Sequence, residues 1–172
     1  MTRTLTVVLA AALMASCGEG GSPESGSTGS STPATPAAAP TPAAGPTDAE
    51  KAILLASLPA PYNVADLENG RRAFARCRAC HTLPEGGPNM VGPNLWGVFG
   101  RVAGTHPDFN YSPAVKAAGF VWDAEKLDAW LAGPRTFLPG NKMAFPGLPD
   151  ATDRRDIIAY LKVETGYKAP AE

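Results

Sequence analysis

The pattern of apolar and polar residues predicts helices in the part of the chain that follows residue 65. From Asp66 onward, Leu67, Gly70, Phe74 and Cys77 are spaced so that they share one helical face. Glycine is less favourable than alanine inside a helix, so we expect Gly70 to permit the close approach of another helix. No stretch alternates between apolar and polar residues as a half-buried strand does. The pattern therefore favours an all-α domain.

Three further helices are expected, joined by long segments rich in turn residues. They run from about residue 112 to 116, from 123 to 132 and from 152 to 166. The residues that would cap their starts are Ser112 followed by Pro113, Asp123, and Thr152 with Asp153. The apolar faces of the last two helices consist of Leu127, Trp130 and Leu131, and of Ile157, Ile158, Tyr160 and Leu161. Loops this long are unusual in a compact domain, and a large apolar cofactor that they wrap would account for them.

A short helix is also expected ahead of this domain, from Glu50 to Leu58. Ile53, Leu54 and Leu58 would lie on one side of it, and two prolines follow it closely. The sequence leaves open whether this helix packs on the domain or belongs to the segment before it.

Glycine, serine, threonine, alanine and proline dominate the chain from Gly18 to Asp48. The 18 Gly and 18 Pro are too many for one compact domain, and many of them lie in this segment. Such a segment cannot bury enough apolar surface to offset its ordering entropy, so we interpret it as a linker. The expected organisation is a signal peptide (1–16), an anchor cysteine with a linker (17–48), a helical extension (49–62), a domain (63–168) and a tail (169–172).

The first 16 residues are typical of an export signal. The apolar run Leu5–Met14 is ten residues long, too short to cross a bilayer, which needs about 20. Leu13–Cys17 resembles a bacterial lipobox, whose cysteine is lipidated. The alternative is cleavage near Ala15, which leaves Cys17 as a free exported thiol, a liability. We therefore favour lipidation of Cys17, which would anchor the protein on the periplasmic side of a bacterial membrane, inner or outer.

The charge balance argues against two classes of partner. The chain has 15 Lys and Arg against 16 Asp and Glu, a formal net charge of −1, and a pI of about 6.1. Binding to nucleic acid, or to a membrane surface through basic residues, calls for an excess of positive charge. We expect neither partner.

The candidate chemistry is concentrated in Cys77-Arg78-Ala79-Cys80-His81, which has the haem-attachment pattern CxxCH. Residues three apart on a helix lie on one face, so both thiols could form thioethers to the same haem. His81 would then offer an imidazole nitrogen to the iron. A redox disulfide and half of a zinc site are the alternatives. A zinc site needs two further ligands, and only His106 and Cys17 remain as soft donors. A thioredoxin-like redox disulfide would follow a strand, whereas a helix is expected before this motif.

Three residues are candidates for a second axial ligand: Met90, His106 and Met143. Met90 lies too close in sequence to the first ligand, and His106 lies in a polar turn next to a proline. Met143 lies in an extended segment between two helices, long enough to cross the other face of the haem. Its apolar neighbours also fit plain core packing. We favour Met143 as the ligand.

Several segments resemble, in order and without long gaps, those of the class I, mitochondrial-type cytochromes c. The resemblance runs from about Asp66 to Val163. The segments that carry it are Gly70-Arg-Arg-Ala-Phe74, Cys77 to His81, Gly92-Pro-Asn-Leu95, Gly97-Val-Phe-Gly-Arg101, Tyr111, Trp122, Pro139-Gly-Asn-Lys-Met143 and Asp156-Ile-Ile-Ala-Tyr-Leu161. The part before it is similar to the N-terminal part of membrane-tethered bacterial versions.

The resemblance implies the cytochrome c fold, a few helices and long loops around one covalently attached haem c. The Pro93 carbonyl would accept a hydrogen bond from His81. The expected donors to the haem propionates are Arg101, Tyr111, Trp122 and Asn141. The residues expected to line the pocket are Leu95, Leu131, Phe145 and Leu161. Gly70 and Phe74 would cross the last helix.

The chain departs from the family at several positions. Trp130 stands where the family usually has a tyrosine near the methionine sulfur, and an indole donates a hydrogen bond but cannot accept one. Val115 replaces an asparagine that usually helps hold an internal water. Few basic residues remain around the expected haem edge, chiefly Arg135 and Lys142, so steering toward an acidic partner should be weak.

These features predict a monomeric electron carrier, not an enzyme. The implied partners are a quinol-oxidising complex as donor and a terminal oxidase or a photosynthetic reaction centre as acceptor. Two ligands on the iron would leave no position for a substrate. The alternative is a peroxidase-like haem enzyme or a gas sensor with a labile sixth ligand. A third interpretation is a tethered subunit fixed in a larger complex.

Overall fold

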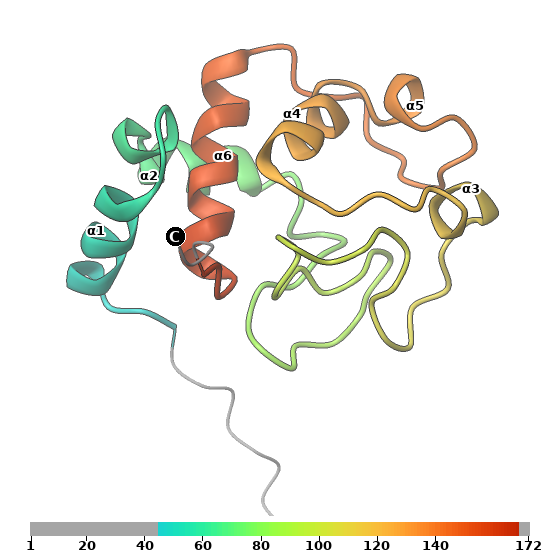
Figure 1. Cartoon of the computed structure of the whole chain (residues 1–172), viewed down its shortest axis with the longest axis horizontal. Coiled ribbons are helices and arrows are strands. Elements are labelled where there is room, and N and C mark those ends of the chain that lie inside the picture. Colours follow the sequence, from blue (N-terminus) through green and yellow to red (C-terminus); the bar gives the residue numbers. More distant parts are fainter. Residues whose placement is uncertain (1–44, 169–172) are drawn as a thin grey trace, which may run out of the picture. The chain divides into compact units, whose positions relative to one another are not determined.

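The computed structural model describes residues 45–168, and the predictions for the signal peptide, Cys17 and most of the linker lie outside them. Its helices are α1 (Asp48–Ser57), the 3-10 turn η1 (Tyr62–Val64), α2 (Leu67–Phe74), α3 (Pro113–Lys116), α4 (Ala124–Ala132), α5 (Pro134–Phe137) and α6 (Ala151–Glu164) (Figure 1). The β-pairing in this range is a single bridge between Val102 and Val121. The described domain is all-α, which confirms the predicted fold class.

The first helix of the domain, α2, crosses the last one, α6, at Gly70. A Cβ atom there would lie 2.8 Å from the Cβ of Tyr160 and would also overlap the backbone carbonyl of Asp156. One turn on, the rings of Phe74 and Tyr160 contact each other at a centroid distance of 5.7 Å. Glycine is therefore needed at this crossing, as the sequence predicted.

A buried carboxylate joins the same two helices. Asp156 is only 1% exposed. Its oxygens accept hydrogen bonds from the Asn69 amide (2.9 Å), from the backbone N–H of Asp66 (3.2 Å) and from the Arg155 guanidinium (2.6 Å). These donors satisfy a charge that would otherwise be costly to bury.

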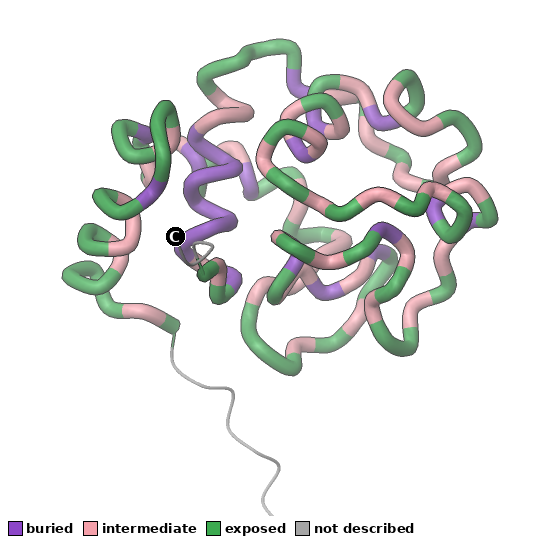
Figure 2. Tube along the Cα trace, in the orientation of Figure 1, coloured by how far each residue is buried: buried purple, intermediate pink, exposed green. Residues whose placement is uncertain are grey.

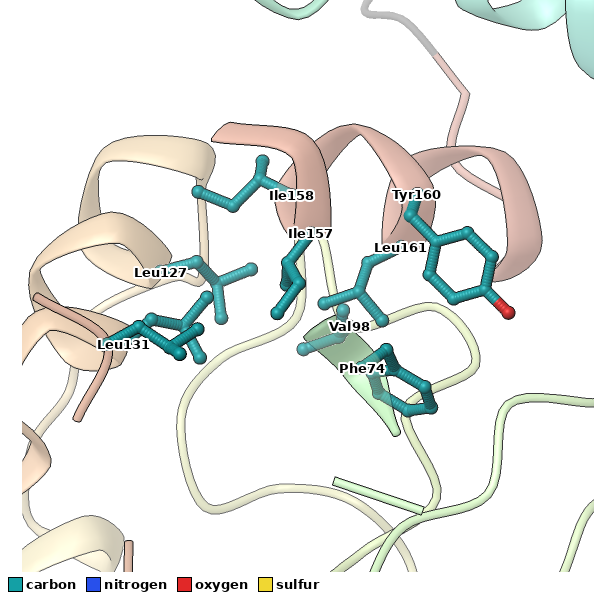
Figure 3. Packing of buried hydrophobic residues seen from close by; sticks show 9 residues of the cluster. Phe74, Val98, Leu127, Leu131, Ile157, Ile158, Tyr160 and Leu161 are labelled. Atoms are coloured by element: carbon teal, nitrogen blue, oxygen red, sulfur yellow. The ribbon is translucent and has the colours of Figure 1, made fainter. Parts of the chain in front are cut away.

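The core lies between α2, α4 and α6. Leu127 and Leu131 of α4 pack against the buried face of α6, which includes Ile157 and Ile158. Figure 3 shows these side chains pointing toward one another, together with Val98 from the long loop between α2 and α3. The predicted apolar faces of both helices are thus buried, although Trp130 of α4 is only half-buried.

The start of the last helix and the segment after α4 differ from expectation. The last helix begins at Ala151 because the Asp150 side chain accepts from the backbone N–H groups of Thr152 (2.7 Å) and Asp153 (3.0 Å), so Asp150 is the cap. The Gly133-Pro134 break does end α4, but proline suits the first position of a helix, and α5 begins at once.

The helix ahead of the domain, α1, packs on α6. Its start has a reciprocal cap, in which the Thr47 side chain and the Glu50 carboxylate each accept from the other's backbone N–H. Leu58, which follows the helix, is buried against Ala159 of α6. The prediction that Ile53 lies on the apolar side of this helix is wrong. Ile53 is 71% exposed, because the helix is turned to place Leu54 and Leu55 inward.

Burial is uneven along the domain. Figure 2 shows buried residues concentrated along α6, whereas the loops that follow α2 are mostly half-buried or exposed. Among the described residues, no helix combines the length and the apolar character that crossing a bilayer requires.

Candidate functional site

The CxxCH motif forms a helical turn just beyond α2. The backbone N–H of Cys77 donates to the Phe74 carbonyl (2.8 Å), and that of His81 donates to the Cys77 carbonyl (2.9 Å). The second bond links residues four apart, as in an α-helix, so Cys77 and Cys80 lie on one side of the turn. Both thiols are free and half-buried. Burial raises the pKa of the Cys77 thiol to about 11, which keeps it protonated at neutral pH.

The imidazole of His81 is held by its neighbours. Its Nδ1 atom lies 2.7 Å from the carbonyl oxygen of Pro93, which fixes the ring and makes Nδ1 the donor in the neutral tautomer. A Cβ atom on Gly92 would lie 2.7 Å from Nδ1, so the loop backbone lies directly against the ring. Burial lowers the pKa of His81 and so favours the neutral imidazole, whose Nε2 lone pair can bind a metal.

The loop that supplies Pro93 is braced by Asn94, which is 2% exposed. Its amide nitrogen donates to Thr82 Oγ1 (2.7 Å) and to the Pro84 carbonyl (2.9 Å), and its amide oxygen accepts from the backbone N–H of Trp96 (2.9 Å). This asparagine ties the segment after His81 to the segment that holds the imidazole. Asn94 lies in one of the segments that resemble the family, but the sequence predicted no role for it.

Arg101 is a half-buried cation near this loop. Its guanidinium donates to the carbonyls of Trp96 (3.0 Å) and Asn94 (3.3 Å). Burial lowers its pKa, and none of the ion pairs found within residues 45–168 includes it. Tyr111 lies close enough to interact with it electrostatically. A cation held this way has remaining capacity for an anionic group of a ligand.

The Met143 loop is organised by Asn141. The Asn141 amide nitrogen donates to the carbonyls of Pro134 and Leu138, both at 2.8 Å, and its oxygen accepts from the Met143 backbone N–H at 2.8 Å. Both amide hydrogens are thus used within the loop, so a bond from Asn141 to a propionate would replace one of them.

The other two ligand candidates have different surroundings. Met90 is 47% exposed, whereas Met143 is half-buried. His106 uses Nδ1 in a contact with the carbonyl of Pro107 at 2.9 Å. No group of three or more His, Cys, Asp or Glu side chains gathers as a metal site within the described part of the chain.

Aromatic side chains form a cluster beside the Met143 loop. Trp122 contacts Trp130 at a centroid distance of 5.5 Å, and Phe137, at the end of α5, contacts Trp130 at 6.1 Å. Phe120 completes the cluster, 5.5 Å from Phe137. Of the four expected lining residues, Leu131 and Leu161 belong to the main core cluster, and Leu95 and Phe145 pack against it. The sequence indicated Phe137 only as an apolar neighbour of Met143, because one aromatic residue in a short turn gives no pattern that predicts a cluster.

These residues fit a haem c. Two thiols lie on one turn, a neutral imidazole is oriented by a carbonyl, and a half-buried arginine has no carboxylate partner among residues 45–168. The first two features match covalent attachment and axial ligation, and the third matches a propionate.

Comparison with known proteins gives the same answer. The sequence matches no family model. It is 44% identical over 110 residues to cytochrome c2 of Agrobacterium tumefaciens, covering 62% of this chain and 98% of that protein. The chain belongs to the cytochrome c family. Among solved structures, cytochrome cH from Methylobacterium extorquens is similar, with 45% identity, a TM-score of 0.54 and coverage of 57% of this chain and 98% of that one.

Some relatives are longer than the region they share with this cytochrome. A cytochrome c homolog of Bradyrhizobium diazoefficiens is 43% identical over 107 residues, which cover 62% of this chain but only 58% of that protein. The chain therefore spans little more than half of the length of that relative.

The family assignment fixes the cofactor and the class of function. Cytochromes c carry one haem c bound covalently through two cysteines, and they are electron carriers rather than enzymes. This confirms the predicted fold, cofactor and functional class. The ligand set, the anchor and the redox partners belong to the proposal that follows.

Proposed function

We propose that this cytochrome carries single electrons between membrane complexes with an iron held by His81 and Met143. The observation that carries the proposal is the imidazole of His81, pinned through Nδ1 to the Pro93 carbonyl one helical turn beyond Cys77. Such a hydrogen bond orients a ligating histidine and raises its basicity. The bound haem iron supplies the one-electron couple.

Met143 is the proposed second ligand because its loop is built to hold one geometry. Asn141 fixes the Met143 backbone N–H, and α5 anchors the other end of the loop through Phe137 in the aromatic cluster. A thioether ligand favours the ferrous state and so a high reduction potential. If His81 and Met143 both held the iron, no position on it would remain for a substrate.

The remaining site residues are assigned supporting roles. Arg101, with Tyr111, Trp122 and Asn141, is proposed to hold the propionates; Leu95, Trp130 and Phe145 are proposed to exclude water from the haem. Arg101 has the firmest support, because it is half-buried without a carboxylate partner among the described residues.

The proposed setting is the periplasmic side of a bacterial membrane, with Cys17 lipidated and the following segment acting as a tether. The donor would be a quinol-oxidising complex, and the acceptor a terminal oxidase or a photosynthetic reaction centre. The few basic residues around the expected haem edge, chiefly Arg135 and Lys142, predict weak electrostatic steering. Electron-transfer encounters typically have small, transient interfaces, and we expect one here. Replacing Cys17 with serine should release the protein from membranes, and its retention there would disprove this anchor.

The ligand assignment is tested by the matched variants Met143→Ala and Met90→Ala. Loss of Met143 should lower the reduction potential by on the order of a few tenths of a volt, within the range that axial ligands span. It should also allow cyanide or carbon monoxide to bind at once. Loss of the exposed Met90 should change neither property. An unchanged potential and unchanged ligand binding in Met143→Ala would disprove the assignment.

A further inference from the structure

Lys162, on the last helix, is a buried cation enclosed by aromatic rings. It is only 5% exposed. Its Nζ atom lies 3.4 Å from the ring centroid of Tyr167, 4.5 Å from that of Phe99 and 5.8 Å from that of Tyr62. No ion pair within the described residues includes it. Aromatic faces therefore supply the attraction that a carboxylate usually gives a buried ammonium.

The three rings come from three separate parts of the chain. Tyr62 belongs to η1, ahead of the region that resembles cytochrome c. Phe99 lies in the loop that also carries Leu95 and Arg101. Tyr167 follows the end of α6 and contacts Phe99 edge to face at 5.5 Å. One ammonium thus contacts all three parts at once.

The segment before the domain has two further attachments to α6. Lys51 of α1 forms an ion pair with Glu164 at 2.7 Å. Leu58, between α1 and η1, packs in an apolar cluster with Ala65 and Ala159. The segment from α1 to η1, which we name the strap (residues 48–64), is therefore fixed along the C-terminal part of the last helix.

The loop on the other side of Lys162 is also fixed to the end of α6. The Gly97 backbone N–H donates to the Thr165 carbonyl at 2.9 Å. A Cβ atom on Gly166 would lie 2.6 Å from the Trp96 ring, so the chain end presses on this loop. Movement of Lys162 or Tyr167 would therefore reach the segment that positions Arg101.

We propose that Lys162 is a positioning residue that latches the strap to the loop carrying Leu95 and Arg101, so that the order of this loop depends on docking of the strap. The strap then does more than continue the linker, because it sets the point on the domain to which the linker is joined. The latch itself does not depend on the proposed function. Only the statement that this loop contacts the haem rests on that function.

Amide hydrogen exchange on the full-length holoprotein tests the latch. Tyr62→Leu removes the ring that the strap contributes, whereas Tyr62→Phe keeps it and is the matched control. Tyr62→Leu should speed exchange by about tenfold both at Ala65, whose N–H donates to the Tyr62 carbonyl, and at Gly97 and Arg101. Tyr62→Phe should leave all three amides at wild-type rates.

Lys162→Met tests the same coupling from the helix side. It should raise exchange at the same amides, and adding Tyr62→Leu to it should cause little further change, because the two side chains act through one contact. Lys116→Met, an exposed lysine, is the control. Faster exchange in the strap with an unchanged loop, or fully additive effects, would overturn the proposal. The ferric spectrum of the same samples reports the Met143 assignment separately, so failure of one proposal is distinguishable from failure of the other.

Discussion

The helical crossing of this cytochrome and the loops that we propose to bind its haem are held together in different ways. At the crossing of α2 and α6, order comes from side-chain packing, with Phe74, Ile157 and Ile158 all buried. In the loops, order comes from side-chain amides that bind backbone groups, with Asn94 and Asn141 each serving three groups or more. Figure 2 shows the same contrast, because burial follows α6 rather than the loops.

This difference indicates that the loops, rather than the helical crossing, depend on the cofactor for their order. Packed helices exclude water by their own apolar faces. Hydrogen bonds in half-buried loops contribute little net stability while water can compete for the same groups. The loops therefore need a large apolar partner between them, whereas the crossing does not.

Removing the attachment point should disorganise the loops far more than the crossing. In the double variant Cys77→Ser, Cys80→Ser, we expect no cooperative thermal transition for the loops, because the cofactor no longer covers their apolar side chains. Amide exchange should become fast from Gly87 to Arg101 and near Met143, and it should remain slowest in α6. Loop amides as protected as those of the holoprotein would contradict this view.

Gly70→Ala should be the most damaging single change at the crossing. The new methyl group would meet the Asp156 carbonyl and the Tyr160 Cβ, so the helices must separate. Overpacking of this kind costs about 3 kcal/mol. Denaturant unfolding of the holoprotein measures it. Glu68→Ala, which removes an exposed ion pair from the same helix, is the control and should cost about 0.5 kcal/mol or less. Equal losses for the two variants would count against the close approach.

The crossing was far easier to predict from the sequence than the loops were. Helical spacing indicated the faces that contain Leu127 and Ile157, and a glycine inside a helix indicated a close approach. Periodicity cannot report which way a short helix turns, as Ile53 shows. The bracing by Asn94 and Asn141 depends on partners brought together by folding, which no local pattern encodes.

The residues of the functional site also differ in how far the sequence alone predicts them. CxxCH carries its chemistry in five consecutive residues, so Cys77, Cys80 and His81 could be singled out at once. The part played by Pro93 came only from resemblance to a family. Lys162 was missed altogether, because lysine is usually exposed and a helix position between buried residues gives no sign of an aromatic cage.

Asn94→Ala should destabilise the loops by a smaller amount than the change at the crossing. It leaves the backbone N–H of Trp96 without its acceptor and removes the bonds that the buried amide donates to Thr82 and Pro84, which costs about 2 kcal/mol. The same unfolding measurement reports it, and faster exchange near Pro93 should accompany it. Asn110→Ala, at an exposed position in another loop, should behave as the wild type. A similarly stable Asn94→Ala would show that the loop does not need this amide.

The smallest effect concerns pH. Burial lowers the pKa of Lys162 to about 8, whereas an unfolded lysine titrates near 10.4. Between these values the unfolded state binds more protons than the folded state, so stability rises with pH; below about pH 8 both states are protonated and the contribution disappears. The groups that face the amine are the Tyr62 and Tyr167 phenols, and Asp123 acts on it from the start of α4.

This pH effect can be isolated with Lys162→Met. The stability of the wild type relative to the variant should rise by about 1 kcal/mol between roughly pH 8 and 9. Denaturant unfolding at several pH values measures the difference, which removes contributions common to both proteins. A difference independent of pH would show that the pKa of Lys162 is not lowered.

The most direct test of the central claim is the absorption spectrum of the purified protein in its oxidised and reduced states. An iron bound by His81 and Met143 predicts a low-spin spectrum in both states, with an iron–thioether charge-transfer band in the oxidised one that is lost in Met143→Ala. A high-spin oxidised spectrum that changes at once on addition of cyanide would contradict the assignment.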